Sequence, residues 1–275
     1  MTQRIDNAFR AARKAGRKVL IPYVMAGDPD LATTLALIPA LQRAGADIIE
    51  LGIPFSDPIA DGPVILRAAM RALAHDTSLD DVLKLAARVR AACDVPMVFM
   101  SYYNPIHHYG VERFVRDAVA AGVDGVIVPD LPPEEGHELI VAARAAGLAT
   151  IFLLAPTSDE TRIRKVSRQA TGFVYYVSLT GITGAGHANA QDVATHLTAI
   201  RAHTNKPIAV GFGISTPEQA RQMGQFADGV IVGSALVKEI ETGVEKGRQG
   251  DALVRTATDF VARLRQGLDG GGPGH

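Results

Sequence analysis

Two acidic residues, Glu50 and Asp61, flank a loop rich in proline in the stretch IELGIPFSDPIADGP, residues 49–63. Glu50 ends an apolar run, where a carboxylate is poorly solvated, so its pKa is expected to rise towards neutrality. Such a group can donate and accept protons at pH 7. Asp61 lies on a loop nearer water and is expected to stay ionised. Two carboxylates in unlike environments predict an acid/base group beside a fixed anion.

Each acid also has an ordinary structural interpretation. Glu50 could be a buried acid that pairs with an arginine, and Asp61 could be a turn residue before Gly62. For Asp61 alone the turn is the better interpretation, because Asp-Gly is a common turn sequence. Glu50 is harder to explain in this way, because charged residues are almost never fully buried without a partner. The third acid, Asp57, lies between Ser56 and Pro58, which is typical of a turn or docking residue.

Glycine-rich turns provide a second signal for chemistry. They end three late apolar runs and read SLTGITGAG (178–186), GFGIST (211–216) and VGSALVKEI (232–240). Gly213 permits close approach of a ligand to the backbone, and Gly233 and Ser234 open a short helix whose free amides attract an anion. No lysine or arginine lies among the glycines of these turns, so a phosphate would be bound by backbone amides and the Ser234 hydroxyl. The three turns together predict a phosphorylated substrate.

Other chemistries are disfavoured by what the strand ends lack. None of the lysines follows an apolar run, which disfavours a Schiff-base mechanism; they are Lys14, Lys18, Lys84, Lys165, Lys206, Lys238 and Lys246. His107 and His108 are adjacent, and adjacent residues rarely bind one metal ion, so no metal site is expected. Large side chains near the strand ends could form an apolar pocket, although core packing explains any single one; they are Tyr23, Met100, Tyr102, Tyr175 and Phe212.

The overall composition excludes several classes of partner. The 28 basic and 29 acidic residues nearly cancel, so neither nucleic-acid nor membrane binding is indicated. Cys93 is the only cysteine, which favours a reducing compartment. The first 16 residues are amphipathic and charged and contain no apolar signal core. We therefore expect a cytoplasmic protein.

Eight short apolar runs alternate with segments of helical period. These elements must position Glu50, Asp61 and the glycine-rich turns. Continuous apolarity is typical of parallel strands buried on both faces. The runs span residues 19–24, 47–53, 96–102, 124–130, 149–155, 172–178, 207–213 and 228–234. This rhythm predicts a single α/β domain, a (β/α)8 TIM barrel over residues 1–266, with an extended loop and extra helix after the second strand. Residues 267–275 are expected to form a flexible glycine-rich tail.

In such a barrel the active site lies at the C-terminal ends of the strands. Glu50, Asp61 and the glycine turns all belong to that end. The residues alone therefore predict a lyase or isomerase that needs no metal or cofactor and acts on a phosphorylated compound by acid/base catalysis.

Five stretches together resemble the alpha subunit of tryptophan synthase, with a likeness from about Arg4 to Leu264. They are LIPYVMAGDP, ELGIPFSDPIADGP, GITGA, VGFGIS and VGSALV. The resemblance implies a lyase that cleaves indole-3-glycerol phosphate to indole and glyceraldehyde 3-phosphate in tryptophan biosynthesis. It also implies a heterotetramer of two alpha and two beta subunits, with pyridoxal phosphate only on beta and no cofactor on this chain.

The resemblance assigns roles to individual residues. Glu50 matches the acid/base that protonates indole C3, and Asp61 matches the acid at the indole N–H. The matched substrate-binding positions are Tyr23, Met100, Tyr175 and Phe212 around the ring, Thr183 on the loop that would close over Asp61, and Gly184, Gly213, Gly233 and Ser234 around the phosphate. Leu179 departs from the arginine of some relatives, and Tyr23 from their phenylalanine.

Three alternatives remain open at this point. Another phosphate-binding barrel is one, either phosphoribosylanthranilate isomerase or indole-glycerol-phosphate synthase, although the latter would be expected to place lysine at strand ends. A stand-alone lyase that releases free indole is the second. A non-catalytic regulatory subunit is the third, and the presence of both Glu50 and Asp61 argues against it.

Overall fold

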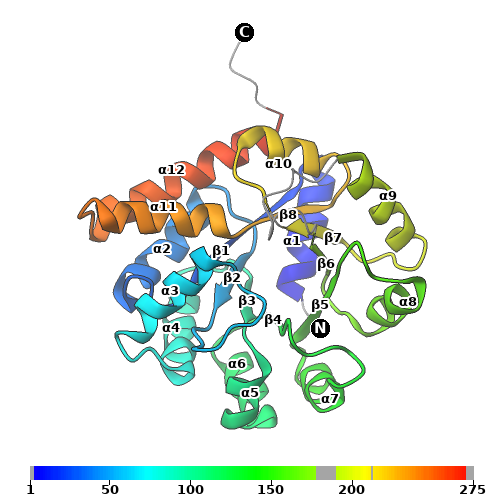
Figure 1. The fold of residues 1–275 in the computed structure, drawn as a ribbon, viewed down its shortest axis with the longest axis horizontal. Coiled ribbons are helices and arrows are strands. Elements are labelled where there is room, and N and C mark those ends of the chain that lie inside the picture. Colours follow the sequence, from blue (N-terminus) through cyan, green and yellow to red (C-terminus); the bar gives the residue numbers. More distant parts are fainter. Residues whose placement is uncertain (1–2, 178–189, 212, 271–275) are drawn as a thin grey trace.

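The computed structural model describes residues 3–177, 190–211 and 213–270. Eight parallel strands close into a barrel in the order of the chain, with β1 next to β8 (Figure 1). The predicted barrel is confirmed. The strands are β1 Val19–Met25, β2 Ile49–Gly52, β3 Met97–Met100, β4 Gly125–Ile127, β5 Ala149–Leu154, β6 Val174–Val177, β7 Ile208–Gly211 and β8 Gly229–Val232.

Helices surround the strands. In the described residues they are α1 Gln3–Lys14, α2 Leu31–Arg43, α3 Pro63–Leu73, α4 Leu79–Ala92, α5 Tyr103–Tyr109, α6 Val111–Ala120, α7 His137–Ala146, α8 Glu160–Gln169, α9 Ala190–Arg201, α10 Pro217–Gly224, α11 Ser234–Glu245 and α12 Gly250–Leu268. Two of them, α3 and α4, lie between β2 and β3, as the long spacing after the second strand predicts. Polar residues begin several helices; Ser78 and Asp81 form a capping box at α4, and Thr216 and Gln219 form one at α10.

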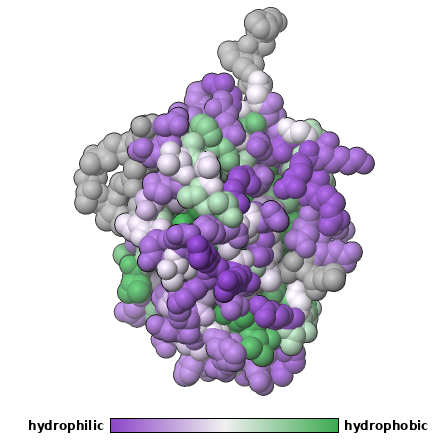
Figure 2. All heavy atoms as spheres, turned by 90° about the vertical axis from the view of Figure 1, so that its right-hand side faces the viewer, coloured by the Kyte–Doolittle hydropathy of each residue, from purple (hydrophilic) through white to green (hydrophobic). Residues whose placement is uncertain are grey.

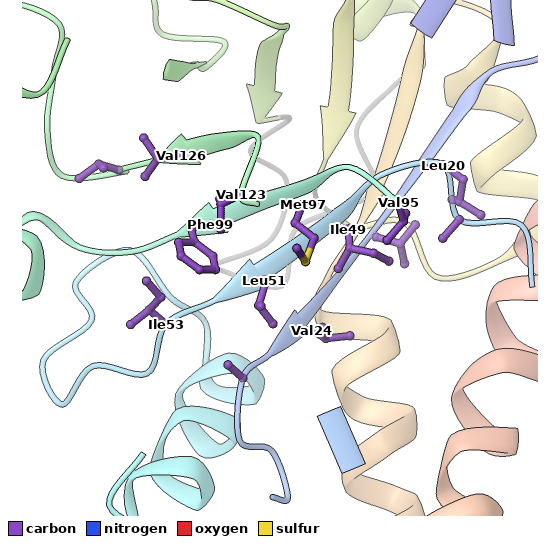
Figure 3. Packing of buried hydrophobic residues seen from close by; sticks show 14 of the residues in the cluster. Leu20, Val24, Ile49, Leu51, Ile53, Val95, Met97, Phe99, Val123 and Val126 are labelled. Carbon is purple, nitrogen blue, oxygen red and sulfur yellow. The ribbon is translucent and has the colours of Figure 1, made fainter. Parts of the chain in front are cut away.

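Alternate residues of each strand face the helices or the barrel interior. The outward residues, such as Val24, Ile49, Leu51 and Phe99, pack in a continuous apolar layer against the helices (Figure 3). The inward residues form a second cluster, in which Ile5 and Phe9 of α1 take part. Helix α1 therefore closes the N-terminal end of the barrel and leaves the C-terminal end for a site.

Three aspartates reinforce the N-terminal end of the barrel. Asp47, Asp124 and Asp228 precede β2, β4 and β8, and each accepts a backbone N–H of the neighbouring strand at 2.9 to 3.0 Å. Each also pairs with an arginine, respectively Arg265, Arg90 and Arg201. This end of the barrel is thus held by ion pairs and has the character of a structural rim.

The last helix changes one prediction. Gly267 and Leu268, placed in the flexible tail from the sequence, are buried residues of α12. A side chain on Gly267 would clash with Pro217 of α10, so glycine here allows α12 to pack closely against that helix. Residues 271–275 lie outside the described part. Within that part no helix combines the length and apolarity needed to cross a membrane, and the face in Figure 2 is mostly hydrophilic, with apolar residues in small separate areas.

Candidate active site

Glu50 is the second residue of β2, and its side chain lies in the barrel interior. Its neighbours Ile49 and Leu51 face the helices, so the alternation of the strand turns Glu50 inward. It stands in register with Tyr23 of β1 and Val98 of β3 and is only 2% exposed. Its Oε2 atom is buried and has no hydrogen-bond partner in the described residues. Within those residues Glu50 forms no ion pair, so the arginine-paired interpretation is not supported.

Burial changes the acidity of both carboxyl groups. It raises the pKa of Glu50 to about 8, and the negative charge of Asp61 adds to that rise. It also raises the pKa of Asp61 to about 6, although a hydrogen bond from Tyr102 opposes the shift. Asp61 is therefore less solvated than its loop position suggests. At pH 7 the expected state is still a protonated Glu50 beside an ionised Asp61.

Tyr102 is a site residue that the sequence did not single out beyond its aromatic character. It lies just after β3, where its hydroxyl donates a hydrogen bond to Asp61 and accepts the backbone N–H of Ala60 at 3.0 Å. The Phe55 and Tyr102 rings lie 5.6 Å apart. Tyr102 thus fixes the end of the loop that carries Asp61. The only sequence signal for it was an aromatic residue at a strand end.

Two tyrosines of the barrel interior lie beside glycines of adjacent strands. A side chain on Gly52 would overlap the hydroxyl of Tyr23, and one on Gly211 would overlap the hydroxyl of Tyr175. Burial raises the pKa of both tyrosines well above the usual range, and the charge of Glu50 contributes in each case. For Tyr23 the charge of Asp61 is a larger contribution than that of Glu50. Tyr23 and Tyr175 therefore both lie near Glu50, and Tyr23 lies near Asp61 as well.

The glycine turns after β7 and β8 lie side by side, because these two strands pair. Gly213 has a φ of +74°, and a Cβ added there would meet no atom of the described residues within 4 Å. Gly233 precedes α11, and Ser234 is the first residue of that helix. The free backbone amides at the start of a helix form an anion site. Within the described residues, the backbone at Gly213 is thus open to a ligand, and the turn that carries it lies beside the turn that begins α11.

Met100 is the last residue of β3. It packs against the inward cluster of the barrel and also against the cluster that contains Tyr23 and Met25. It is only partly buried, so it can offer surface to a ligand. Among the predicted site residues, Glu50, Asp61, Tyr23, Tyr175 and Met100 are therefore gathered at the C-terminal end of the barrel.

A family model described as "Tryptophan synthase alpha chain" matches residues 9–265. The chain belongs to this family. Tryptophan synthase alpha chain of Geobacter sulfurreducens is 54% identical over 267 residues, covering 96% of this chain and 98% of that protein. The same protein of Geotalea daltonii is 55% identical over 265 residues, with 96% and 98% covered.

Solved structures agree with this assignment. Tryptophan synthase subunit alpha from Legionella pneumophila str. Paris has a TM-score of 0.90 and 40% identity, and 97% of this chain and 98% of that chain are covered. Tryptophan synthase from M. tuberculosis, in its aminoacrylate-bound form, has a TM-score of 0.85 and 35% identity, with 96% and 99% covered. Membership of the tryptophan synthase alpha chain family confirms the predicted lyase of tryptophan biosynthesis that cleaves indole-3-glycerol phosphate. The other two barrel enzymes considered from the sequence are thereby set aside.

Four positions discussed from the sequence lie outside the described residues. These are Thr183, Gly184, Phe212 and Leu179. Their assignments remain predictions from the resemblance. Among the described residues no group of three or more histidine, cysteine, aspartate or glutamate side chains could hold a metal ion.

Proposed function

We propose that Glu50 and Asp61 together cleave the carbon–carbon bond of indole-3-glycerol phosphate. The observation that carries the proposal is the buried Oε2 of Glu50, which has no hydrogen-bond partner among the described residues. The pKa of Glu50 is raised to about 8, and that of Asp61 to about 6. A buried acid that is protonated at pH 7 can transfer its proton to a carbon atom of a bound ring. This arrangement separates the proton donor from the anion, as the reaction requires.

Glu50 acts at both ends of the breaking bond. Its proton is transferred to indole C3, which turns the ring into an electron sink. The bond between C3 and the glycerol carbon then breaks, and its electron pair returns to the ring. The carboxylate left on Glu50 takes the proton from the hydroxyl of that glycerol carbon, which becomes the aldehyde of glyceraldehyde 3-phosphate. Glu50 ends protonated again, so the cycle consumes no proton and needs no cofactor on this chain.

Asp61 stabilises the charge that develops at the other side of the ring. Protonation at C3 places positive charge on the indole nitrogen, and an anionic carboxylate at the N–H favours that state. The hydrogen bond from Tyr102 holds the Asp61 carboxylate in place and favours its ionised form. Preorganised charge of this kind lowers the barrier without rearrangement during the reaction.

The remaining site residues position the substrate. Tyr23, Met100 and Tyr175 supply apolar and aromatic surface for the ring near Glu50, and Gly213, Gly233 and Ser234 supply the phosphate site. Phe212, Gly184 and Thr183 are assigned to the same sites by the resemblance. In this proposal the ring and the phosphate are bound at opposite ends of one elongated pocket across the barrel mouth.

A tryptophan synthase beta subunit is the proposed partner, in an alpha2beta2 assembly that would place pyridoxal phosphate on beta. The likeness to a solved structure named tryptophan synthase, with 35% identity and a TM-score of 0.85, supports this partner. The loop of residues 53–62 and the segment 101–105 lie at the open end of the barrel and are the proposed contact. We also propose a cytoplasmic location.

The experiment is an assay of the purified chain with indole-3-glycerol phosphate, with and without a cognate beta subunit. We expect indole and glyceraldehyde 3-phosphate to form in equal amounts, and cleavage to be faster with the beta subunit than without it. Equal rates with and without beta would support a stand-alone lyase. If neither preparation cleaves the substrate, the proposed roles of Glu50 and Asp61 are wrong.

A further inference from the structure

An ion cluster of Asp28, Arg71 and Glu241 joins three segments behind the candidate active site. Asp28 follows β1, Arg71 lies on α3 and Glu241 lies on α11. The Arg71 guanidinium binds Asp28 with two nearly parallel hydrogen bonds of 2.7 and 2.9 Å and donates a third to Glu241 at 2.9 Å. A planar guanidinium in such a fork fixes orientation as well as distance.

Two more cations bind the same acid. Arg67 of α3 donates to Glu241 at 2.6 and 2.9 Å, and Lys238 donates to it at 2.7 Å. The hydrogen bond from Arg67 is the largest cause that lowers the pKa of Glu241. Asp28 and Glu241 are nearly inaccessible, at 2% and 3% exposure. Both acids are thus buried and satisfied by cations, so α3 has few alternative positions relative to α11.

The two helices that the cluster joins begin at the two parts of the proposed substrate site. Helix α3 begins at Pro63, just after Asp61 in the chain, and α11 begins at Ser234 in the phosphate turn. Between these helices lies a small apolar cluster that includes Ala68, Val237 and the ring of Tyr23. The charge of Asp28 also contributes to the raised pKa of Tyr23, after burial and other charges. The cluster can therefore affect the substrate site through the relative positions of α3 and α11, without contact with the substrate.

We infer that Arg71, held by Asp28 and Glu241, is a positioning residue that sets the distance between Asp61 and the phosphate turn at Ser234. This inference rests on the proposed function, because one elongated substrate must meet both sites at once. If α3 moved, a substrate with its phosphate at Ser234 would have its ring displaced from Asp61. A substrate with its ring at Asp61 would have its phosphate displaced from Ser234. Misplacement by about 1 Å can reduce the rate roughly 100-fold.

The opposite end of the barrel offers a matched control. Arg90 of α4 binds Asp124 at 2.9 Å and the Gly122 carbonyl at 2.9 and 3.1 Å. Its side chain is 14% exposed and that of Arg71 is 24% exposed, so the two arginines are similarly enclosed. The cluster around Arg90 carries no proposed site residue. If Arg71 had only a structural role, its replacement and that of Arg90 would have similar effects on stability and on kcat/KM.

The test compares Arg71→Lys with Arg90→Lys, each of which keeps the charge and removes the guanidinium fork. Melting temperature, kcat and KM for indole-3-glycerol phosphate are measured on the full chain, well below the melting temperatures. Both variants are expected to melt earlier. Arg71→Lys is expected to raise KM and lower kcat, with kcat/KM falling about tenfold or more, while Arg90→Lys keeps both constants. A kcat/KM of Arg71→Lys within twofold of the Arg90→Lys value would overturn the inference.

A second variant covers the case in which Arg71→Lys does not fold. Glu241→Gln keeps an oxygen that can accept from Arg67 or Arg71 and removes the buried charge. It is expected to show the same fall in kcat/KM, and wild-type constants would contradict the inference. Assays of the unsubstituted chain show whether the inference about Arg71 has failed or the proposed function has failed. If the unsubstituted chain cleaves the substrate and loses cleavage in Glu50→Gln, the proposed function stands whatever Arg71 does.

Discussion

Glu50 and Asp61 are coupled: the negative charge of Asp61 adds to the effect of burial and raises the pKa of Glu50 to about 8. The two acids belong to a single βα unit, Glu50 to β2 and Asp61 to the loop before α3. The proposed mechanism depends on this coupling, since it keeps one proton on the pair at neutral pH.

Replacement of Glu50 by glutamine should abolish cleavage. Glutamine keeps the shape of the side chain but cannot transfer a proton, so kcat should fall by at least about 100-fold, the usual contribution of acid/base catalysis. KM should change little. The exposed Glu245→Gln on α11 is the control and should behave as wild type. Near-normal turnover of Glu50→Gln would remove Glu50 from the mechanism.

The pH dependence of kcat/KM should be bell-shaped. Activity needs an ionised Asp61, whose pKa is raised to about 6, and a protonated Glu50, whose pKa is raised to about 8. The rate should therefore rise through the lower value and fall through the higher one, with a maximum near pH 7. A profile that stays flat between pH 5 and 9 (about one pH unit beyond each value) would be inconsistent with these two groups.

Stability should also depend on Glu50. Its pKa is higher in the folded state than the ordinary value of 4.5, so between these values the folded protein binds more protons than the unfolded chain. Stability from this group is fully present below pH 4.5 and is lost as the pH rises through about 8. The melting temperature of wild type relative to Glu50→Gln should therefore decrease from acidic to alkaline pH. A constant difference would mean that the pKa of Glu50 is not raised.

Tyr102→Phe should change the acid limb of the rate profile. Without the hydroxyl, Asp61 loses the hydrogen bond that lowers its pKa, and the limb should move to higher pH. The loop also loses the acceptor for the Ala60 N–H, so kcat/KM should fall about tenfold. Tyr109→Phe is the control, because its hydroxyl donates to Asp117 on the outer helices. An acid limb unchanged in Tyr102→Phe would show that this hydrogen bond does not act on Asp61.

Gly213→Val should weaken binding of the phosphorylated substrate. Gly213 has a positive φ, and its missing side chain leaves open space where the phosphate is proposed to lie. Gly247 has a similar φ of +72° and also faces open space, far along the chain in the turn after α11. Both valine variants should lose roughly 1 to 2 kcal/mol of stability from backbone strain. Only Gly213→Val should raise KM, by about tenfold or more; equal KM values in the two variants would exclude the phosphate site.

The fold could be predicted from the sequence because its signals are local. Each strand, such as β2 or β8, is a short run of buried apolar residues, and α4 begins with the Ser78 capping box. Gly267 was misassigned because glycine disfavours helices, whereas here its small size allows contact with Pro217. The helix end depends on a neighbour that is distant in sequence.

The site could be predicted only in part for the same reason. Glu50 was found because a charge within an apolar strand is conspicuous in the sequence itself. The spacing of residues does not reveal contacts between separate elements. The hydrogen bond from Tyr102 to Asp61 and the ion pairs of Arg71 are contacts of this kind. The raised pKa of Asp61 likewise depends on how deeply its loop packs, and the loop composition suggested more solvent than the structure provides.

The proposed mechanism requires a Glu50 whose pKa is raised by burial and by Asp61. The most direct measurement is a titration of the Glu50 side-chain carboxyl carbon by NMR, in wild type and in Asp61→Asn. We expect a midpoint of about 8 in wild type, and a lower midpoint in Asp61→Asn because the neighbouring charge is gone. A midpoint near 4.5, the ordinary value for a glutamate, would contradict it.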